Sequence, residues 1–469
     1  MLIIVSDIHL GDGTCGRSIS PSAFQHFADR LKELARYASW RADGTYRPIE
    51  NIDILLLGDI LDPLHSNLWL EKADDQPDHV RPWTDPQAPE YAEMVGRITT
   101  NILRRNAESI QALKRIASGE AVHIPPADGK GGAAATAPER ISVPVRIHYM
   151  VGNHDWYYHL QGEQFDQVRQ EIIQSIGLSN PPTRFPYSLT EPGAEWLKSL
   201  LDGYSVFARH GDFYDSFNFP PNRKKAINED TSLLRDASSL GDVFAVEIVN
   251  RFAVEAKEAF KDKLPAQLIE SLSELVNVRP ALATSLWISS QLRQCKVSAK
   301  DQEGLKELWD SLCKEFIKHP FVRAANKRFR LDIVDMLQLG INIFDKFSFQ
   351  SMDNLALFIR KKFRAGDEIL FCGHALKEEA FKEGNTQFVV YGHTHHHEIV
   401  PLDSVLSTPR PTNQMYLNSG TWHTYFDLAI NKPEQKKFVP YQVLTYLAFF
   451  KDDERSGRRF ETWSGAFSD

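Results

Sequence analysis

The chain has few cysteines, no long apolar run and no excess of basic residues. Its thiols, Cys15, Cys295, Cys313 and Cys372, have neither the paired spacing of a disulfide framework nor that of a zinc finger, which favours reduced cysteines. No stretch is apolar for long enough to cross a membrane, and the start of the chain lacks the basic region of a signal peptide. These absences predict a cytoplasmic protein without a transmembrane segment.

The charge balance also excludes a class of partner. Lys and Arg number 54 against 62 Asp and Glu, a formal net charge of −8, so the composition does not favour non-specific binding to nucleic acid or to an anionic membrane. A hydrophobic content of 42% and a charged content of 25% are ordinary for a globular protein. At 469 residues the chain exceeds the usual size of one core, so we expect a catalytic domain with a second module.

Five short polar clusters each follow an apolar run. The runs LIIV, IDILLLG, VRIHYMVG, YSVFAR and TQFVVYG have the length and the β-branched residues of strands buried on both faces. The clusters that follow them contain Asp7 and His9, Asp59, Asn153 to Asp155, His210, and His393 with His395. Because open α/β sheets carry their chemistry at the carboxyl ends of the strands, we expect these clusters to converge.

The side chains in these clusters suit a pair of metal ions. Carboxylate, amide oxygen and imidazole ligands without thiolate favour two divalent ions, Mn²⁺ first and Fe or Zn²⁺ as alternatives. One ion would take Asp7, His9 and His395, the other would take Asn153, His210 and His393, and Asp59 would be shared. A carboxylate bridge holds two cations roughly 3.5–4 Å apart, so a hydroxide between them can attack phosphorus in line. The predicted reaction is the hydrolysis of a phosphoester.

The order of the clusters, DxH, GD, GNHD, HGD and GHTH, resembles that of the calcineurin-like metallophosphoesterase superfamily. This resemblance implies an α/β fold, a four-layer α-β-β-α sandwich, with the seven residues above as the metal ligands. It also implies that His154 faces the phosphate and stabilises the transition state or protonates the leaving oxygen. Asp155 would orient His154 or the Asn153 loop.

The resemblance and the helical patterns divide the chain. We expect a discontinuous metallophosphoesterase core at 1–212 and 388–450, a mainly helical insertion at 213–387, and a charged tail at 451–469. The insertion lies between two ligand-bearing clusters, so it is either a lid over the metals or a module for stability or dimerisation. A lid at this position is similar to that of the UDP-diacylglucosamine hydrolases of lipid A synthesis, although this insertion is far longer. Arg223, Lys224 and Lys225 are candidate phosphate contacts, or else a solvated cationic turn.

Local patterns add several expectations. Helices are predicted over 20–40, over 90–118 without a break, and over 163–177, and a strand with a turn is predicted over 368–376. The strands after residue 396 are expected to complete a second sheet. Asp62 is either close to the metals or a helix-capping or solvated carboxylate. Trp156, Tyr157 and Tyr158 either stack on a substrate or belong to the core.

The function that these patterns favour is the hydrolysis of a small phosphomonoester, phosphodiester or diphosphate. A metal-dependent nuclease or a cyclic-nucleotide phosphodiesterase of the same superfamily is the alternative, and the lack of a basic stripe counts against long DNA. A third interpretation is a non-catalytic scaffold similar to the retromer subunit that keeps this fold. That interpretation is not favoured, because all seven ligand positions and His154 are present.

Overall fold

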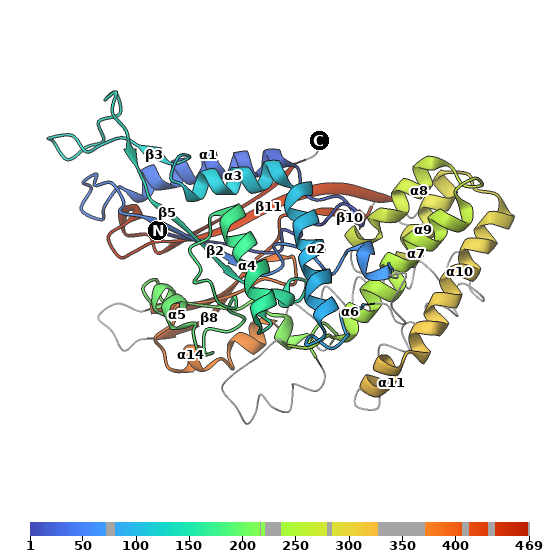
Figure 1. Ribbon diagram of the computed structural model, residues 1–469. Helices are drawn as coiled ribbons and strands as arrows, with labels where there is room; N and C mark the ends of the chain where they lie inside the picture. Colours follow the sequence, from blue (N-terminus) through green and yellow to red (C-terminus); the bar gives the residue numbers. More distant parts are fainter. Residues whose placement is uncertain are drawn as a thin grey trace.

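The computed structural model describes residues 1–71, 80–215, 217–220, 236–278, 284–326, 371–405, 412–429 and 437–467, which form a mixed α/β protein with several sheets (Figure 1). The first sheet has the order β10-β11-β1-β2-β5, with β12 on the other side of β11. Its strands are β1 (Leu2–Val5), β2 (Ile52–Leu57), β5 (Val145–Met150), β10 (Thr424–Leu428), β11 (Phe438–Phe449) and β12 (Phe460–Phe467). Strands β1, β2 and β5 are parallel, and β11 is antiparallel to β1.

The second sheet has the order β6-β7-β9-β8. Its strands are β6 (Val206–Ala208), β7 (Phe388–Tyr391), β8 (His397–Val405) and β9 (Thr412–Ser419). Strands β6, β7 and β9 are parallel, whereas β8 is antiparallel to β9. A short hairpin of β3 (His123–Ile124) and β4 (Ile141–Ser142) stands apart from both sheets.

Alternation along the central strands explains how the layers pack. Successive residues of a strand point to opposite faces, and both faces of β1 and β2 are apolar except at Asp53. Ile3 and Ile54 pack in one buried cluster with side chains of helices, whereas Leu2 and Leu55 pack in another with Val389 of the second sheet. The helices that contribute to the first cluster are α1 (Pro21–Ala38), α2 (Pro89–Arg105), α3 (Ala107–Ala117) and α4 (Glu163–Ile176). Helices therefore cover one face of the first sheet, and the second sheet covers the other.

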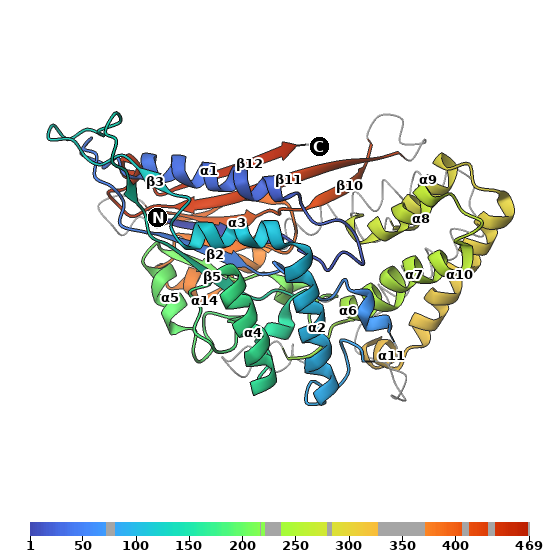
Figure 2. The ribbon, with the colours of Figure 1, turned by 45° about the horizontal axis from the view of Figure 1, so that its top comes forward.

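Smaller helices pack elsewhere on these layers. Helices α5 (Glu195–Asp202) and α14 (Glu379–Lys382) contribute to the cluster between the sheets. Three short helices follow or adjoin the ligand-bearing loops: η1 (Asn67–Leu70), η2 (Trp156–His159) and η3 (Asp212–Tyr214). The last short helix, η9 (Arg455–Gly457), precedes β12. Figure 2 shows α1 and α3 lying along the first sheet, with β11 and β12 beside them.

The part of the insertion that the structure describes is mainly helical, and its buried side chains share a cluster with Cys15 and Phe438 from outside it. It contains α6 (Leu240–Phe244), η5 (Ala245–Asn250), α7 (Arg251–Phe260), α8 (Ala266–Leu272), η6 (Ser273–Asn277), α9 (Thr284–Gln294), α10 (Ala299–Lys318) and α11 (Pro320–Asn326). Val243, Leu268 and Trp309 belong to one buried cluster there. Both ribbon views show these helices together at one end of the sheets (Figures 1 and 2). Among the described residues, no helix has the length and apolarity to span a membrane.

Two helix and strand predictions were wrong. The helix predicted over 90–118 is broken at Asn106, because the Asn106 side chain donates to the carbonyl oxygens of Ile102 and of Gly11, each at 2.8 Å. Of the strand and turn predicted over 368–376, residues 368–370 lie outside the described residues, and 371–375 are helical, with Phe371 in the cluster between the sheets. A short apolar run can fit either a helix or a strand, so its periodicity alone does not predict which of the two forms.

The strands after residue 396 were also partly misplaced. Strands β8 and β9 lie in the second sheet as expected, but β11 pairs with β1 in the first sheet. The segment 451–469, expected to be only a charged tail, contains β12, which pairs with β11 over its whole length. Sequence patterning defines a strand's faces but not its neighbours, which explains both differences.

Candidate metal centre

The strand ends bring the expected ligands together. Strands β1, β2 and β5 are neighbours and parallel, so the loops with Asp7, Asp59 and Asn153 leave the same edge of the first sheet. In the second sheet, His210 follows β6 and His393 follows the neighbouring parallel strand β7, so these two residues also leave one edge of their sheet. Backbone hydrogen bonds join the loops: the amide of Asp7 donates to Gly58 O at 3.0 Å, and the amide of Gly392 donates to His210 O at 2.8 Å.

Five of the expected ligands have left-handed backbone conformations. The φ angles are 53° at Asp7, 52° at His9, 55° at Asp59, 65° at His393 and 63° at His395. Residues other than glycine rarely adopt this conformation, which costs of order 1–3 kcal/mol and persists only where surrounding structure enforces it. The strain is therefore concentrated where these side chains turn toward one another.

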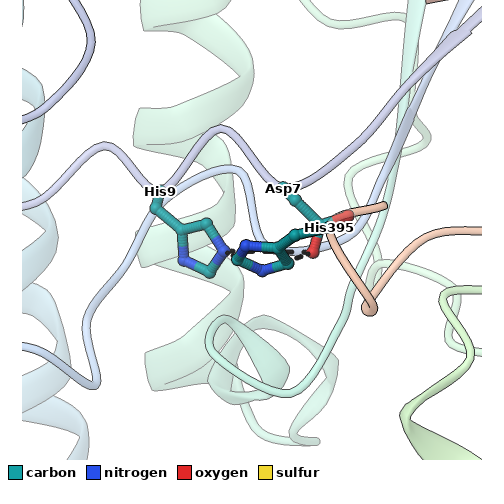
Figure 3. Close-up of side chains that lie close together, drawn as sticks. All are labelled: Asp7, His9 and His395. Carbon is teal, nitrogen blue, oxygen red and sulfur yellow. Dashed lines mark hydrogen bonds and ion pairs between the residues drawn. The ribbon is translucent and has the colours of Figure 1, made fainter. Parts of the chain in front are cut away.

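Asp7, His9 and His395 form one group that could hold a metal ion. Their side chains come from two loops and point toward one another (Figure 3). The Nε2 atoms of His9 and His395 are 3.2 Å apart, and His395 Nε2 is 3.2 Å from Asp7 Oδ1. Two imidazole nitrogens and a carboxylate oxygen thus converge within a space suited to one cation.

Asp59, His210 and His393 form a second such group, with Asn153 among them. His210 Nε2 is 3.2 Å from both Asp59 Oδ2 and Asn153 Oδ1, and His393 Nδ1 is 2.9 Å from Asn153 Oδ1. Asp59 Oδ2 also lies 3.8 Å from His9 Nε2 of the first group. Asp59 is consequently the carboxylate that faces both groups.

The second ring nitrogen of several ligands is fixed by an acceptor. His210 Nδ1 donates to Leu57 O at 2.9 Å, His9 Nδ1 lies 3.1 Å from Asp62 Oδ2, and His393 Nε2 lies 3.1 Å from Asp215 Oδ2. Such contacts set the tautomer of metal-binding histidines and direct the other lone pair into the site. In His210 and His393 that lone pair points at Asn153 Oδ1, an atom that can only accept. A metal ion or a proton between the ring nitrogens and Asn153 Oδ1 would satisfy these facing acceptors. This set of ligand atoms therefore fits metal ions.

The electrostatics of the group also favour positive charge. Burial alone would raise the pKa of the Asp7 carboxyl, but the imidazoles of His395 and His210 lower that pKa to about 2. Burial opposes the protonation of His210, yet the carboxylates of Asp59 and Asp7 raise its pKa well above the ordinary value. The buried carboxylates therefore stay ionised and attract cations.

Glycines before the ligands allow the loops to approach closely. A Cβ atom on Gly58 would lie 2.5 Å from His210 Nδ1, and one on Gly392 would lie 2.7 Å from Asp7 Oδ2. A Cβ atom on Gly152 would lie 2.4 Å from Asp59 Oδ1. The glycine in each of GD, GNHD and GHTH is thus required by the ligand side chains that pack on it.

His154 lies beside the centre and is oriented by Asp62. His154 Nδ1 is 3.0 Å from Asp62 Oδ1, and its Nε2 is 4.0 Å from Asp59 Oδ2. The Asp62 carboxylate also contacts Nδ1 of His65 at 2.9 Å. Burial would raise the pKa of Asp62, but the imidazoles of His154 and His65 and their hydrogen bonds hold it well below its usual range. Of the two roles considered for Asp62, proximity to the site is the one the structure supports.

Asp155 contacts the loops around the centre. Its carboxylate accepts from the backbone amides of Gly152 at 2.6 Å and Ile60 at 2.9 Å, and from the Tyr149 hydroxyl at 2.6 Å. Burial and the nearby charge of Asp59 raise the pKa of Asp155 to about 7. Of its two expected roles, orienting His154 or the Asn153 loop, the second agrees with these contacts.

Other candidates lie in the core or outside the described residues. Trp156, Tyr157 and Tyr158 are almost completely buried, so they are core aromatics rather than a surface for stacking. Arg223, Lys224 and Lys225 fall outside the described residues.

Sequence reasoning missed two histidines near the centre. The ring of His65 lies 4.9 Å from that of His154, and the ring of His423 lies 5.1 Å from that of His9. The spacing of Asp62 and His65, three residues apart in one loop, was the only available signal for His65.

No protein-family model matches this chain, and no curated protein matches it either. The assignment of a function therefore depends on the geometry above.

Proposed function

We propose that this protein is a dinuclear metal-dependent phosphoric ester hydrolase of the calcineurin-like metallophosphoesterase superfamily, with a four-layer α-β-β-α core and a helical cap. The observation that carries the proposal is the convergence of Asp59 with both ligand groups, Asp7–His9–His395 on one side and Asn153–His210–His393 on the other. A shared carboxylate between two imidazole-rich groups is the arrangement expected for two adjacent cations.

Bound divalent ions would neutralise the charge on the phosphoryl oxygens and supply a nucleophile at neutral pH. The residues of the chain would orient the reaction. Asp59 and Asn153 hold the loops in register, since the His154 amide donates to Asp59 Oδ1 at 2.8 Å. His154 has its Nδ1 fixed by Asp62, and its Nε2 would hydrogen-bond a phosphoryl oxygen or give a proton to the leaving oxygen.

The insertion supports the choice of a small substrate. Asn250 of η5 donates to Leu64 O at 3.2 Å, in the loop that carries Asp62 and His65. The cap is thereby attached directly to the catalytic loop, so it would limit access to the centre.

The proposal is tested by hydrolysis of bis-p-nitrophenyl phosphate and p-nitrophenyl phosphate with Mn²⁺, Zn²⁺ or Mg²⁺. We expect metal-dependent turnover that the double substitution Asp59→Asn with His210→Gln removes. Protein that binds stoichiometric metal and hydrolyses neither ester would contradict the proposal. A supercoiled plasmid is the second substrate. Efficient cutting at physiological salt would show that the protein is a nuclease and not a hydrolase of small substrates.

A further inference from the structure

A narrow pocket adjoins the candidate metal centre on the side of His9. It is lined by His9, Asp62 and His65 from the ligand-bearing loops, and by Val276 and Asn277 from η6 of the insertion. The enclosed part has room for a group of about the size of one hydroxyl or one water molecule. The insertion therefore forms one wall of a pocket whose other wall belongs to the centre.

Asn277 offers this pocket a buried acceptor. Its side chain is completely buried, and its Oδ1 has no hydrogen-bond partner among the described residues. The amide orientation is fixed because Nδ2 donates to Glu274 Oε2 at 2.7 Å. A buried carbonyl oxygen without a partner costs about 1–3 kcal/mol, so its retention points to a ligand that donates to it.

His65 offers a second acceptor from the opposite wall. Its Nδ1 lies 2.9 Å from the ionised Asp62 carboxylate, and its backbone amide donates to the other Asp62 oxygen at 3.1 Å. Burial lowers the pKa of His65, which favours the neutral ring with its proton on Nδ1. Nε2 then carries a lone pair, and no described residue contacts that atom with a hydrogen bond.

The nearest cation is already paired. Arg17 also lines the pocket, but its guanidinium is held by Glu270 at 3.2 Å and by Glu274 at 3.1 Å. The pocket thus provides acceptors without a free positive charge for a second phosphate. A positively charged amine is disfavoured as well, because the cations of the proposed centre would lie beside the pocket at His9.

We propose that this pocket binds a hydroxyl group on the alcohol part of the substrate, so that the enzyme prefers phosphoesters of hydroxylated alcohols. The inference rests on the proposed function and specifies the substrate class of the same centre. Asn277 Oδ1 or His65 Nε2 would accept the one proton of the substrate hydroxyl, and a substrate without that hydroxyl would leave the pocket to a water molecule.

The test compares pairs of phosphomonoesters that differ by hydroxyl groups alone. The pairs are 2-hydroxyethyl phosphate with ethyl phosphate, and glycerol 2-phosphate with isopropyl phosphate. With the full chain loaded with Mn²⁺, we expect kcat/KM for the hydroxylated member of at least one pair to be about tenfold or more higher.

Three variants locate the source of this selectivity. Asn277→Ala removes one acceptor, and His65→Asn removes the other while its amide can still donate to Asp62. The variant that removes the acceptor of the hydroxyl proton should lower the ratio of kcat/KM within the preferred pair severalfold. Ser273→Ala is the control, because Ser273 lies in the same short helix and its hydroxyl donates to Glu270 O at the surface. This variant should keep both the wild-type ratio and the wild-type turnover.

The outcomes separate this inference from the proposed function. Hydrolysis of both members of each pair at equal kcat/KM would overturn the hydroxyl pocket and leave the hydrolase intact, since a water would then satisfy the two acceptors. A high ratio that neither Asn277→Ala nor His65→Asn reduces would also overturn it. Absence of hydrolysis of every phosphoester, by protein with bound metal, would instead overturn the proposed function.

Discussion

A methyl group on Gly152 should damage the candidate metal centre while leaving the fold intact. Gly152 does not have a left-handed backbone, so alanine is compatible with its conformation. The added Cβ would nevertheless lie 2.4 Å from Asp59 Oδ1 and 2.7 Å from His210 Cδ2. Ordinary van der Waals contact begins at 3.4 Å, so Asp59 would have to move by 3.4 − 2.4 = 1.0 Å.

The expected effect follows from that displacement. The backbone of Gly152 cannot retreat easily, because its amide donates to the buried Asp155 carboxylate at 2.6 Å. Asp59 faces both ligand groups, so moving it by about 1 Å should lower kcat/KM by about 100-fold. Overpacking should cost about 1–3 kcal/mol of stability, which a domain of this size tolerates. We expect metal affinity to fall by about 10- to 100-fold.

The assay measures Mn²⁺ affinity by calorimetry and turnover of bis-p-nitrophenyl phosphate at saturating Mn²⁺. Gly96→Ala in α2 is the matched control, because its Cβ would lie 3.6 Å from Val168 Cγ2, an ordinary contact. That variant should bind metal and turn over as the wild type does. A Gly152→Ala protein with wild-type Mn²⁺ affinity and wild-type turnover would refute the packing of Gly152 against the ligands.

Three further predictions concern catalysis, metal loading and pH. His154→Ala should lower kcat by about 100-fold or more without loss of bound metal, as measured by steady-state kinetics and elemental analysis, and an unchanged kcat would remove His154 from the mechanism. Removal of metal with EDTA should lower Tm in calorimetry, because ions that bind only the folded state stabilise it, and Asp59→Asn should abolish this difference. Burial raises the pKa of Glu191 to about 8 from an ordinary 4.5, so the folded state keeps a proton that the unfolded state releases, and stability falls as pH rises between these values. Between pH 5 and pH 8 the free energy of unfolding should therefore fall less for Glu191→Gln than for the wild type, the difference being about 1.36 kcal/mol per pKa unit. Denaturant titrations at several pH values measure this. An unfolding free energy that falls equally with pH in both proteins would contradict the assignment.

The sequence predicted the strands that carry the candidate ligands because two independent signals agreed there. Each apolar run was short and β-branched, and each was followed by glycine or a polar ligand residue. The structure forms β1, β2, β5, β6 and β7 from these runs and brings Asp7 and Asp59 together with His210 and His393. Parallel neighbours end at one edge of a sheet, so their ligands converge once these strands pair.

Features that depend on tertiary neighbours were not predictable in this way. The break at Asn106 requires the Gly11 carbonyl as a partner of its side chain, and that carbonyl is 95 residues away in the chain. The pairing of β12 with β11 depends on which edge of the first sheet is open, which no local pattern encodes. Asp62 was recognised only as a possible neighbour of the site, since its contacts with three imidazoles exist only after the loops meet.

The most direct test of the central claim is a crystal structure of Mn²⁺-loaded protein with anomalous scattering recorded at the manganese edge. The account predicts two anomalous peaks roughly 3.5–4 Å apart, one bonded to Asp7, His9 and His395 and the other to Asn153, His210 and His393, with Asp59 bonded to both. A single peak away from Asp59, or no peak at these seven side chains in protein that hydrolyses phosphoesters, would contradict it.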